Sequence, residues 1–320
     1  MPSFKTAVVS ALAAAASVSA LPSTFKLSER QLQYHDLARR QNAGAAAAGL
    51  NDFDILQFAL TLEHLEETFY RTGFQQFPDS DFAALGLNAQ TISDLKQIGK
   101  TEEEHVTFLQ SALAQNGVAP VRPCEYNFGF TDAAGMVATA GILEAVGVSA
   151  YLGAAPLLAD PALLGAAGSI LTIEARHQSS IRVFGASPAI PAGFDVALGP
   201  RHIFSLAAPF ITSCPEGSNL AVEAFPTLAM ADGVDPAALT IGSRVRLTSE
   251  ATSGATHCAF TAGGLVPGGT KFMPFTEGEG CEVPHGVNGV TYVSLTNAGP
   301  LTGALTDDIT LAGPIAMVLS

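Results

Sequence analysis

The spacing Glu-x-x-His occurs twice in this chain, as Glu102 with His105 and as Glu174 with His177. Residues three apart share one face of an α-helix. Both pairs stand among apolar residues, in TEEEHVTFLQ and LTIEARHQSS. One such pair alone is more typical of a solvated acidic helix start, because acidic side chains favour the positive end of the helix dipole. Two such pairs on apolar helices indicate a buried site, because a buried carboxylate costs free energy unless it is paired or binds a metal.

The first half of the chain shows the apolar spacing of amphipathic helices. We expect four of them, over residues 51–74, 88–115, 131–153 and 159–184. Asn51 or Asp52 can cap the first, Thr131 or Asp132 the third, and Asp160-Pro161 is a good start for the fourth. Four helices of about twenty residues, separated by Gly and Pro, predict an antiparallel bundle over residues 50–186.

The first and third helices add a matching pattern, a glutamate followed seven residues later by a tyrosine. These are Glu63 with Tyr70 and Glu144 with Tyr151. Glu144 lies in the apolar stretch GILEAVGVSAYLGAA and therefore needs a partner from another helix. The two tyrosines are expected either to hydrogen-bond to metal ligands or to be simple core aromatics.

Together the four helices supply the ligand inventory of a dinuclear iron or manganese site in a bundle core. The predicted ligands are Glu63, Glu102, His105, Glu144, Glu174 and His177. Glu67, one turn after Glu63, is an alternative to it. Four neighbours are expected on other, solvated helix faces, namely His64, Glu66, Glu103 and Glu104.

The residues before the bundle predict export. Residues 1–20 have a basic start at Lys5, a short apolar run and a small-residue cleavage site, as in a secretory signal peptide. Residues 21–43 end near Arg39-Arg40 and are expected to be a propeptide or a disordered tail.

The four cysteines of an exported chain suggest two disulfides, with three pairings open. We favour Cys258 with Cys281, both in the C-terminal region, and Cys124 with Cys214.

Beyond residue 186, Gly, Pro and Thr become frequent and short β-type runs appear. Residues 187–218 are expected to connect the bundle to a β-rich, sandwich-like domain over residues 219–320, with one short helix near 200–215. The expected strands are 219–225, 244–251, 256–262, 271–276, 291–297 and 309–320. The net charge of −14 argues against a nucleic-acid or anionic-membrane partner.

The segments LQFALTLEHLEETFY, KTEEEHVTFLQSAL, ILEAVGVSAYLGAA and ILTIEARHQSSIR resemble the ferritin-like domain of fungal secreted stress-response and late-sexual-development proteins, and of plant desiccation-related proteins. The resemblance covers about residues 50–230. It implies an all-α ferritin-like four-helix bundle in which Glu102 and Glu174 bridge two metal ions and Glu63 and Glu144 are terminal ligands.

Two functions follow from these features. The first is redox chemistry at a di-iron or di-manganese centre, as an oxidase, a peroxide scavenger or an oxidant of ferrous iron, under oxidative or desiccation stress or in development. The alternative is a non-catalytic, cell-wall or spore-associated protein in which metal only stabilises the fold. Metal ions are the expected partners, with cell-wall association or homo-oligomers as further options. The sequence does not distinguish iron from manganese.

Overall fold

The computed structural model describes residues 50–218, 222–265, 269–301 and 303–319. The predicted signal peptide and the segment 21–43 lie outside the described residues. All described residues fall within one compact unit, so the boundary between the two predicted domains stays a prediction.

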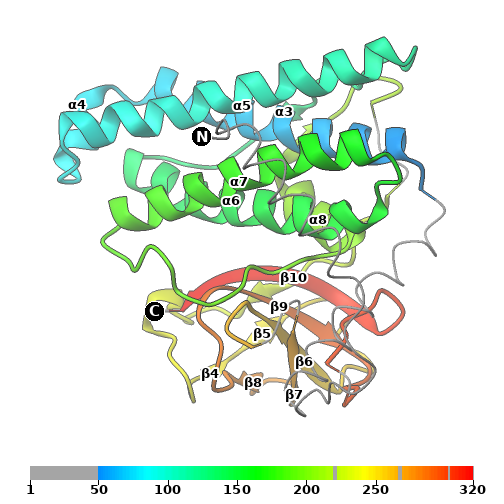
Figure 1. The fold of residues 1–320 in the computed structure, drawn as a ribbon. Helices are drawn as coiled ribbons and strands as arrows, with labels where there is room; N and C mark the ends of the chain where they lie inside the picture. The colour runs from blue at the N-terminus through cyan, green and yellow to red at the C-terminus, as the bar shows by residue number, and fades with distance from the viewer. Residues whose placement is uncertain (1–49, 219–221, 266–268, 302, 320) are drawn as a thin grey trace, which may run out of the picture. The chain divides into compact units, whose positions relative to one another are not determined.

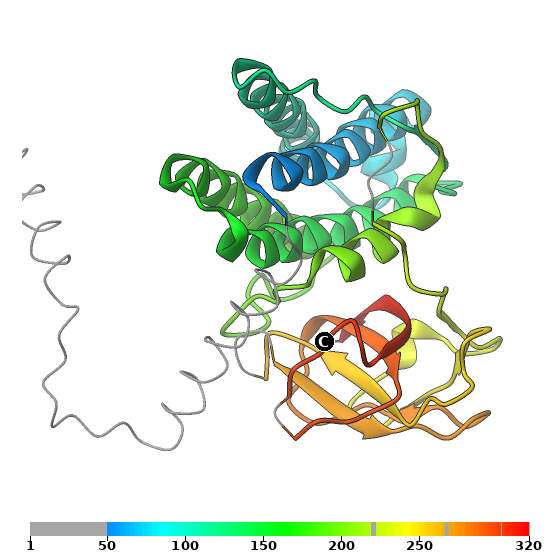
Figure 2. The same ribbon diagram turned by 90° about the vertical axis from the view of Figure 1, so that its right-hand side faces the viewer.

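Four long helices form the first part of the structure, as predicted. They are α3 (Asp52–Gln76), α5 (Ala89–Gln115), α6 (Ala133–Ala154) and α7 (Pro161–Phe184). α3 packs antiparallel against α5, and α6 against α7, as Figures 1 and 2 show. The predicted helices begin and end within a few residues of these bounds.

The helix starts follow from local hydrogen bonds. The Asn51 side chain accepts hydrogen bonds from the first turn of α3, and the Asp54 carboxylate accepts one from the Asn51 backbone in return. Asp132 accepts from Gly135 at the start of α6. Asp160 caps α7 and is followed by Pro161, whose fixed φ suits the first helical position. These residues therefore fix where the helices begin.

Shorter elements surround the bundle. The helix α4 (Asp79–Ala84) was not predicted. The short helix expected near residues 200–215 is α8 (Pro200–Ala207), which is followed by the 3₁₀ turn η2 (Ala208–Phe210). Another 3₁₀ turn, η1 (Ala155–Leu157), follows α6. Strand β2 (Ile211–Ser213) then pairs antiparallel with β1 (Glu125–Tyr126).

The C-terminal part contains a four-stranded antiparallel sheet in the order β10-β9-β6-β7. Its strands are β6 (His257–Thr261), β7 (Thr270–Pro274), β9 (Gly289–Thr296) and β10 (Thr310–Leu319). Two small pairs accompany it, β3 (Ala229–Met230) with β5 (Leu247–Thr248) and β4 (Arg244–Val245) with β8 (Cys281–Glu282), besides the 3₁₀ turn η3 (Pro236–Ala238). A helical region followed by a sheet-containing region confirms the predicted fold class. The strand expected at 219–225 is wrong for its described residues, 222–225, which adopt no regular structure.

Two disulfides close long loops in the pairing favoured above, Cys124 with Cys214 and Cys258 with Cys281. The second joins β6 to β8 inside the core of the sheet region. Such bonds favour the folded state by restricting the unfolded chain.

Helix α6 lies at the centre of the packing. The 25-residue stretch Ala133–Leu157, which is α6 continued by η1, is long and apolar enough to cross a membrane, yet 61% of its most apolar window is buried inside the protein. One of its contacts comes from the sheet region, where the Tyr292 hydroxyl of β9 lies 3.0 Å from Ser149 Oγ. The apolar character of α6 is therefore accounted for by its place in the core.

Candidate metal centre

The six predicted ligands converge in the middle of the bundle. Their ligand atoms form two groups of four, each with all atoms within 4.8 Å of one another. One group is Glu63, Glu102, His105 and Glu174, and the other is Glu102, Glu144, Glu174 and His177. All six side chains are buried. Glu102 and Glu174 belong to both groups, which is the geometry expected of carboxylates shared by two ions.

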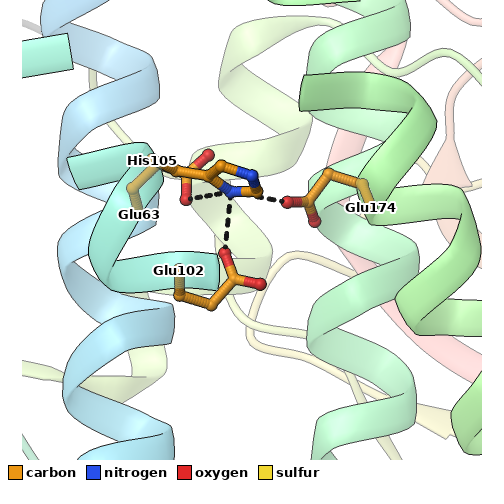
Figure 3. Close-up of side chains that lie close together, drawn as sticks. All are labelled: Glu63, Glu102, His105 and Glu174. Carbon is orange, nitrogen blue, oxygen red and sulfur yellow. Dashed lines mark hydrogen bonds and ion pairs between the residues drawn. The ribbon is translucent and has the colours of Figure 1, made fainter. Parts of the chain in front are cut away.

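His105 directs one ring nitrogen at three carboxylates, as Figure 3 shows. Its Nδ1 lies 3.2 Å from Glu63 Oε2, 3.1 Å from Glu102 Oε2 and 3.3 Å from Glu174 Oε1. One nitrogen carries at most one proton, so it cannot donate fully to three oxygens. Three oxygens and a nitrogen around a common point are instead a set that a cation can bind.

His177 is placed in a similar way in the second group. Its Nδ1 lies 2.8 Å from Glu102 Oε1 and 3.1 Å from Glu144 Oε2. Its other nitrogen, Nε2, lies 2.9 Å from Thr101 Oγ1. Thr101 thus holds the ring so that Nδ1 faces the carboxylates, as outer partners of ligand histidines do.

The two tyrosines lie directly against the ligand carboxylates. The Tyr151 hydroxyl donates a hydrogen bond of 2.5 Å to Glu63 Oε1, and the Tyr70 hydroxyl donates one to Glu144 Oε1. Burial, together with the negative charge of the bonded carboxylate, raises the pKa of each tyrosine well above its usual value. Both hydroxyls therefore stay protonated and remain hydrogen-bond donors.

Burial and mutual charge dominate the acid–base behaviour of the cluster. Burial raises the pKa of Glu102 to about 7, although the two nearby histidines lower it. Burial and then the charge of Glu102 raise the pKa of Glu174 well above the usual range. Burial alone would lower the pKa of His177, but hydrogen bonds to Glu102 and Glu144 outweigh it and raise that pKa to about 10. Without metal, the cluster is therefore held together by protons.

The hydrogen bonding of the cluster is incomplete. Glu174 Oε2 is buried without a hydrogen-bond partner among the described residues, and Glu102 Oε1 and Glu174 Oε1 each face only a histidine nitrogen that they share with other carboxylates. Buried carboxylate oxygens without partners are costly. The two shared carboxylates are thus the ones whose oxygens are least satisfied by hydrogen bonds, so the donor set fits a pair of oxygen-preferring metal ions.

The neighbouring acidic residues are only partly where the sequence placed them. Glu103 and Glu104 are exposed, as expected, and Glu67 forms an ion pair of 2.7 Å with Arg71 instead of joining the cluster. The prediction that His64 and Glu66 lie on solvated helix faces is wrong, because both side chains are buried. α3 is buried on every side between Leu60 and Glu66, so the helical period does not identify a solvated face there.

Glu66 is the residue near the site that the sequence interpretation missed. Burial and the charge of Glu174 raise the pKa of Glu66 well above its usual value. Its position three residues after Glu63 was a usable signal, because that spacing returns to the same helix face.

Comparisons with known proteins found the following similarities. Residues 51–185 match the family described as the ferritin-like domain. Protein rds1 of Schizosaccharomyces pombe is 28% identical over 178 residues, which are 55% of this chain and 44% of that protein. The match thus spans less than half the length of this relative. A solved structure of a conserved hypothetical protein from Mycobacterium tuberculosis is 20% identical and covers 42% of this chain and 93% of its own, with a TM-score of 0.35. Residues 51–185 of this chain are thus similar to the ferritin-like domain.

Proposed function

We propose that the bundle binds two iron or manganese ions and serves in redox chemistry on oxygen, peroxide or ferrous iron in an exported protein. The observation that carries the proposal is the convergence of Glu63, Glu102, His105, Glu144, Glu174 and His177 on two adjoining points. Four carboxylates balance the charge of two divalent ions, which supports a pair rather than a single ion.

The residues of the chain would have distinct tasks. Glu102 and Glu174 would be shared by both ions, while Glu63 with His105, and Glu144 with His177, would each serve one. Tyr151 and Tyr70 would hold the terminal carboxylates in place, and the surrounding apolar core would limit access of water. When bound, such ions supply one-electron steps for oxygen or peroxide chemistry.

Two observations support export and a stress role. The two disulfides are of the kind found in oxidising compartments. The resemblance to fungal stress-response proteins suggests oxidative or desiccation stress, or development, as the setting.

The first experiment is elemental mass spectrometry of the secreted protein beside a Glu174→Ala/His177→Ala variant. About two irons or manganeses per wild-type chain, lost in the variant, are expected from the ligand count. No metal in either protein, even after anaerobic loading with ferrous iron, would reject the proposal.

The alternative is a non-catalytic role, in which the bound metal only stabilises the fold. It has specific support, because the ligands come from all four long helices and one centre would cross-link them. Oxygen consumption with ferrous iron above two equivalents per chain distinguishes the two roles. Turnover supports redox chemistry, whereas a raised melting temperature without turnover supports the structural role.

A further inference from the structure

An apolar cavity lies between the four long helices at one end of the bundle. The cavity and its opening to solvent together comprise about 590 Å³ of empty space, of which only a small part is enclosed. Its walls come from the first half of α3, the second halves of α5 and α6, and the first half of α7. Small residues make the room, since alanines or glycine line it on α3, α6 and α7, for example Ala59, Gly147 and Ala167.

The inner end of this cavity reaches the candidate metal centre. Tyr151, which holds Glu63, is part of its lining, and so is Gly147, where an added Cβ would lie 2.4 Å from Glu174 Oε2. At the outer side, Phe108 of α5 is 44% exposed and Ala166 of α7 is half-buried. At one end the cavity thus borders residues that contact the centre, and at the other end it is accessible.

Glu66 is the one ionisable carboxyl among the described residues that line the cavity, and that lining contains no lysine, arginine or histidine. The influences on the Glu66 carboxyl are burial and the charges of neighbouring glutamates, with no hydrogen bond to a described residue among them. A carboxyl group can hydrogen-bond to a hydroxyl in either of its protonation states. An anion, in contrast, would meet no cation in this lining and would lose its hydration without compensation.

We propose that this cavity binds an uncharged aliphatic molecule, with its chain along the alanine-rich walls and a single terminal hydroxyl-type group at Glu66. The proposal deepens the proposed function, because it gives the class of organic molecule that reaches the centre. It rests on the lining and not on metal occupancy.

The test is isothermal titration calorimetry of the full chain with 1-hexanol and with hexanoate at pH 8, and metal content is measured in the same samples. We expect saturable one-site binding of 1-hexanol and binding of hexanoate that is at least about tenfold weaker. If hexanol binds while no metal is found, the cavity proposal stands and the metal proposal fails, so the two failures are distinguishable.

Matched variants locate the ligand. Ala167→Leu fills the cavity and should weaken hexanol binding at least about tenfold, whereas Ala162→Leu, an exposed site on the same helix outside the lining, should leave it unchanged. Glu66→Leu should weaken hexanol binding about three- to tenfold through loss of the hydrogen bond. No saturable hexanol binding, equal binding by Ala167→Leu, or hexanoate binding as tight as that of hexanol would each overturn the proposal.

Discussion

At the scale of single residues, Gly147 determines whether the shared carboxylate fits. A Cβ at this position would lie 2.4 Å from Glu174 Oε2 and 3.1 Å from Glu66 Oε1. We therefore expect Gly147→Ala to displace Glu174 and to reduce bound metal well below wild type, as measured by elemental mass spectrometry. Gly165→Ala is the matched control on α7, because an added Cβ there meets open space. The control should keep its metal and gain about 0.5–1 kcal/mol in unfolding free energy. Equal metal content in both variants would contradict this account.

The tyrosine hydroxyls make a second residue-scale prediction. Tyr151→Phe removes the hydrogen bond to Glu63 while it keeps the ring in the core. Removing a group that hydrogen-bonds to a metal ligand typically lowers metal affinity about 10–100-fold. We expect a loss of metal affinity in that range for Tyr151→Phe, measured by competition titration with a chelator. Tyr126→Phe is the control, because that hydroxyl bonds to the Cys124 backbone away from the cluster. If both variants bind metal like wild type, the tyrosines are only core aromatics.

At the scale of elements, the Cys124–Cys214 disulfide holds the second helix pair. The loop that it closes spans 90 residues and contains α6, α7 and α8. Replacing both cysteines by alanine should cost about 2–5 kcal/mol of unfolding free energy, measured by denaturant titration. The Cys258–Cys281 loop spans 23 residues, and in a chain-entropy account its removal should cost about 1 kcal/mol less. The reverse order would show that native-state contacts, not loop length, dominate.

Elements differ in how far the sequence predicts them. The four long helices could be predicted because apolar spacing and the caps Asn51, Asp132 and Asp160 agree. The strands β6, β9 and β10 could be located from their β-branched and apolar runs. Two-residue strands such as β3 and β8 could not, because pairing with a distant partner defines them and no local pattern is long enough.

At the scale of the whole molecule, the repeated motif predicted that the candidate ligands converge. Each Glu-x-x-His pair lies on one helix face, and a four-helix bundle has a single core that such faces can share. The burial of His64 and the contact of Tyr292 with Ser149 depend on how complete surfaces pack, and neither follows from a local pattern. The sequence therefore predicted which six side chains cluster better than it predicted the residues around them.

The whole molecule should also respond to pH in a direction set by the cluster. Glu102, with a pKa of about 7, and His177, with a pKa of about 10, both bind protons more tightly when folded without metal than when unfolded. For a raised pKa, the stabilising contribution is full below the unfolded pKa and is lost as pH rises through the folded value. The metal-free protein should therefore lose stability between about pH 4.5 and 10, on the order of 3 kcal/mol through Glu102 alone.

Metal should reverse this trend, because it replaces the protons that hold the cluster together. The melting temperatures of the metal-loaded and metal-free proteins should move further apart as pH rises from 5 to 8, as measured by calorimetry in buffers that do not bind metal. Glu102→Gln cannot ionise, so the metal-free variant should show a flatter pH dependence than the metal-free wild type. Parallel curves for the loaded and metal-free wild type would mean that the protons and the metal do not compete for the same carboxylates, so the metal of the loaded protein would not be bound by these six residues.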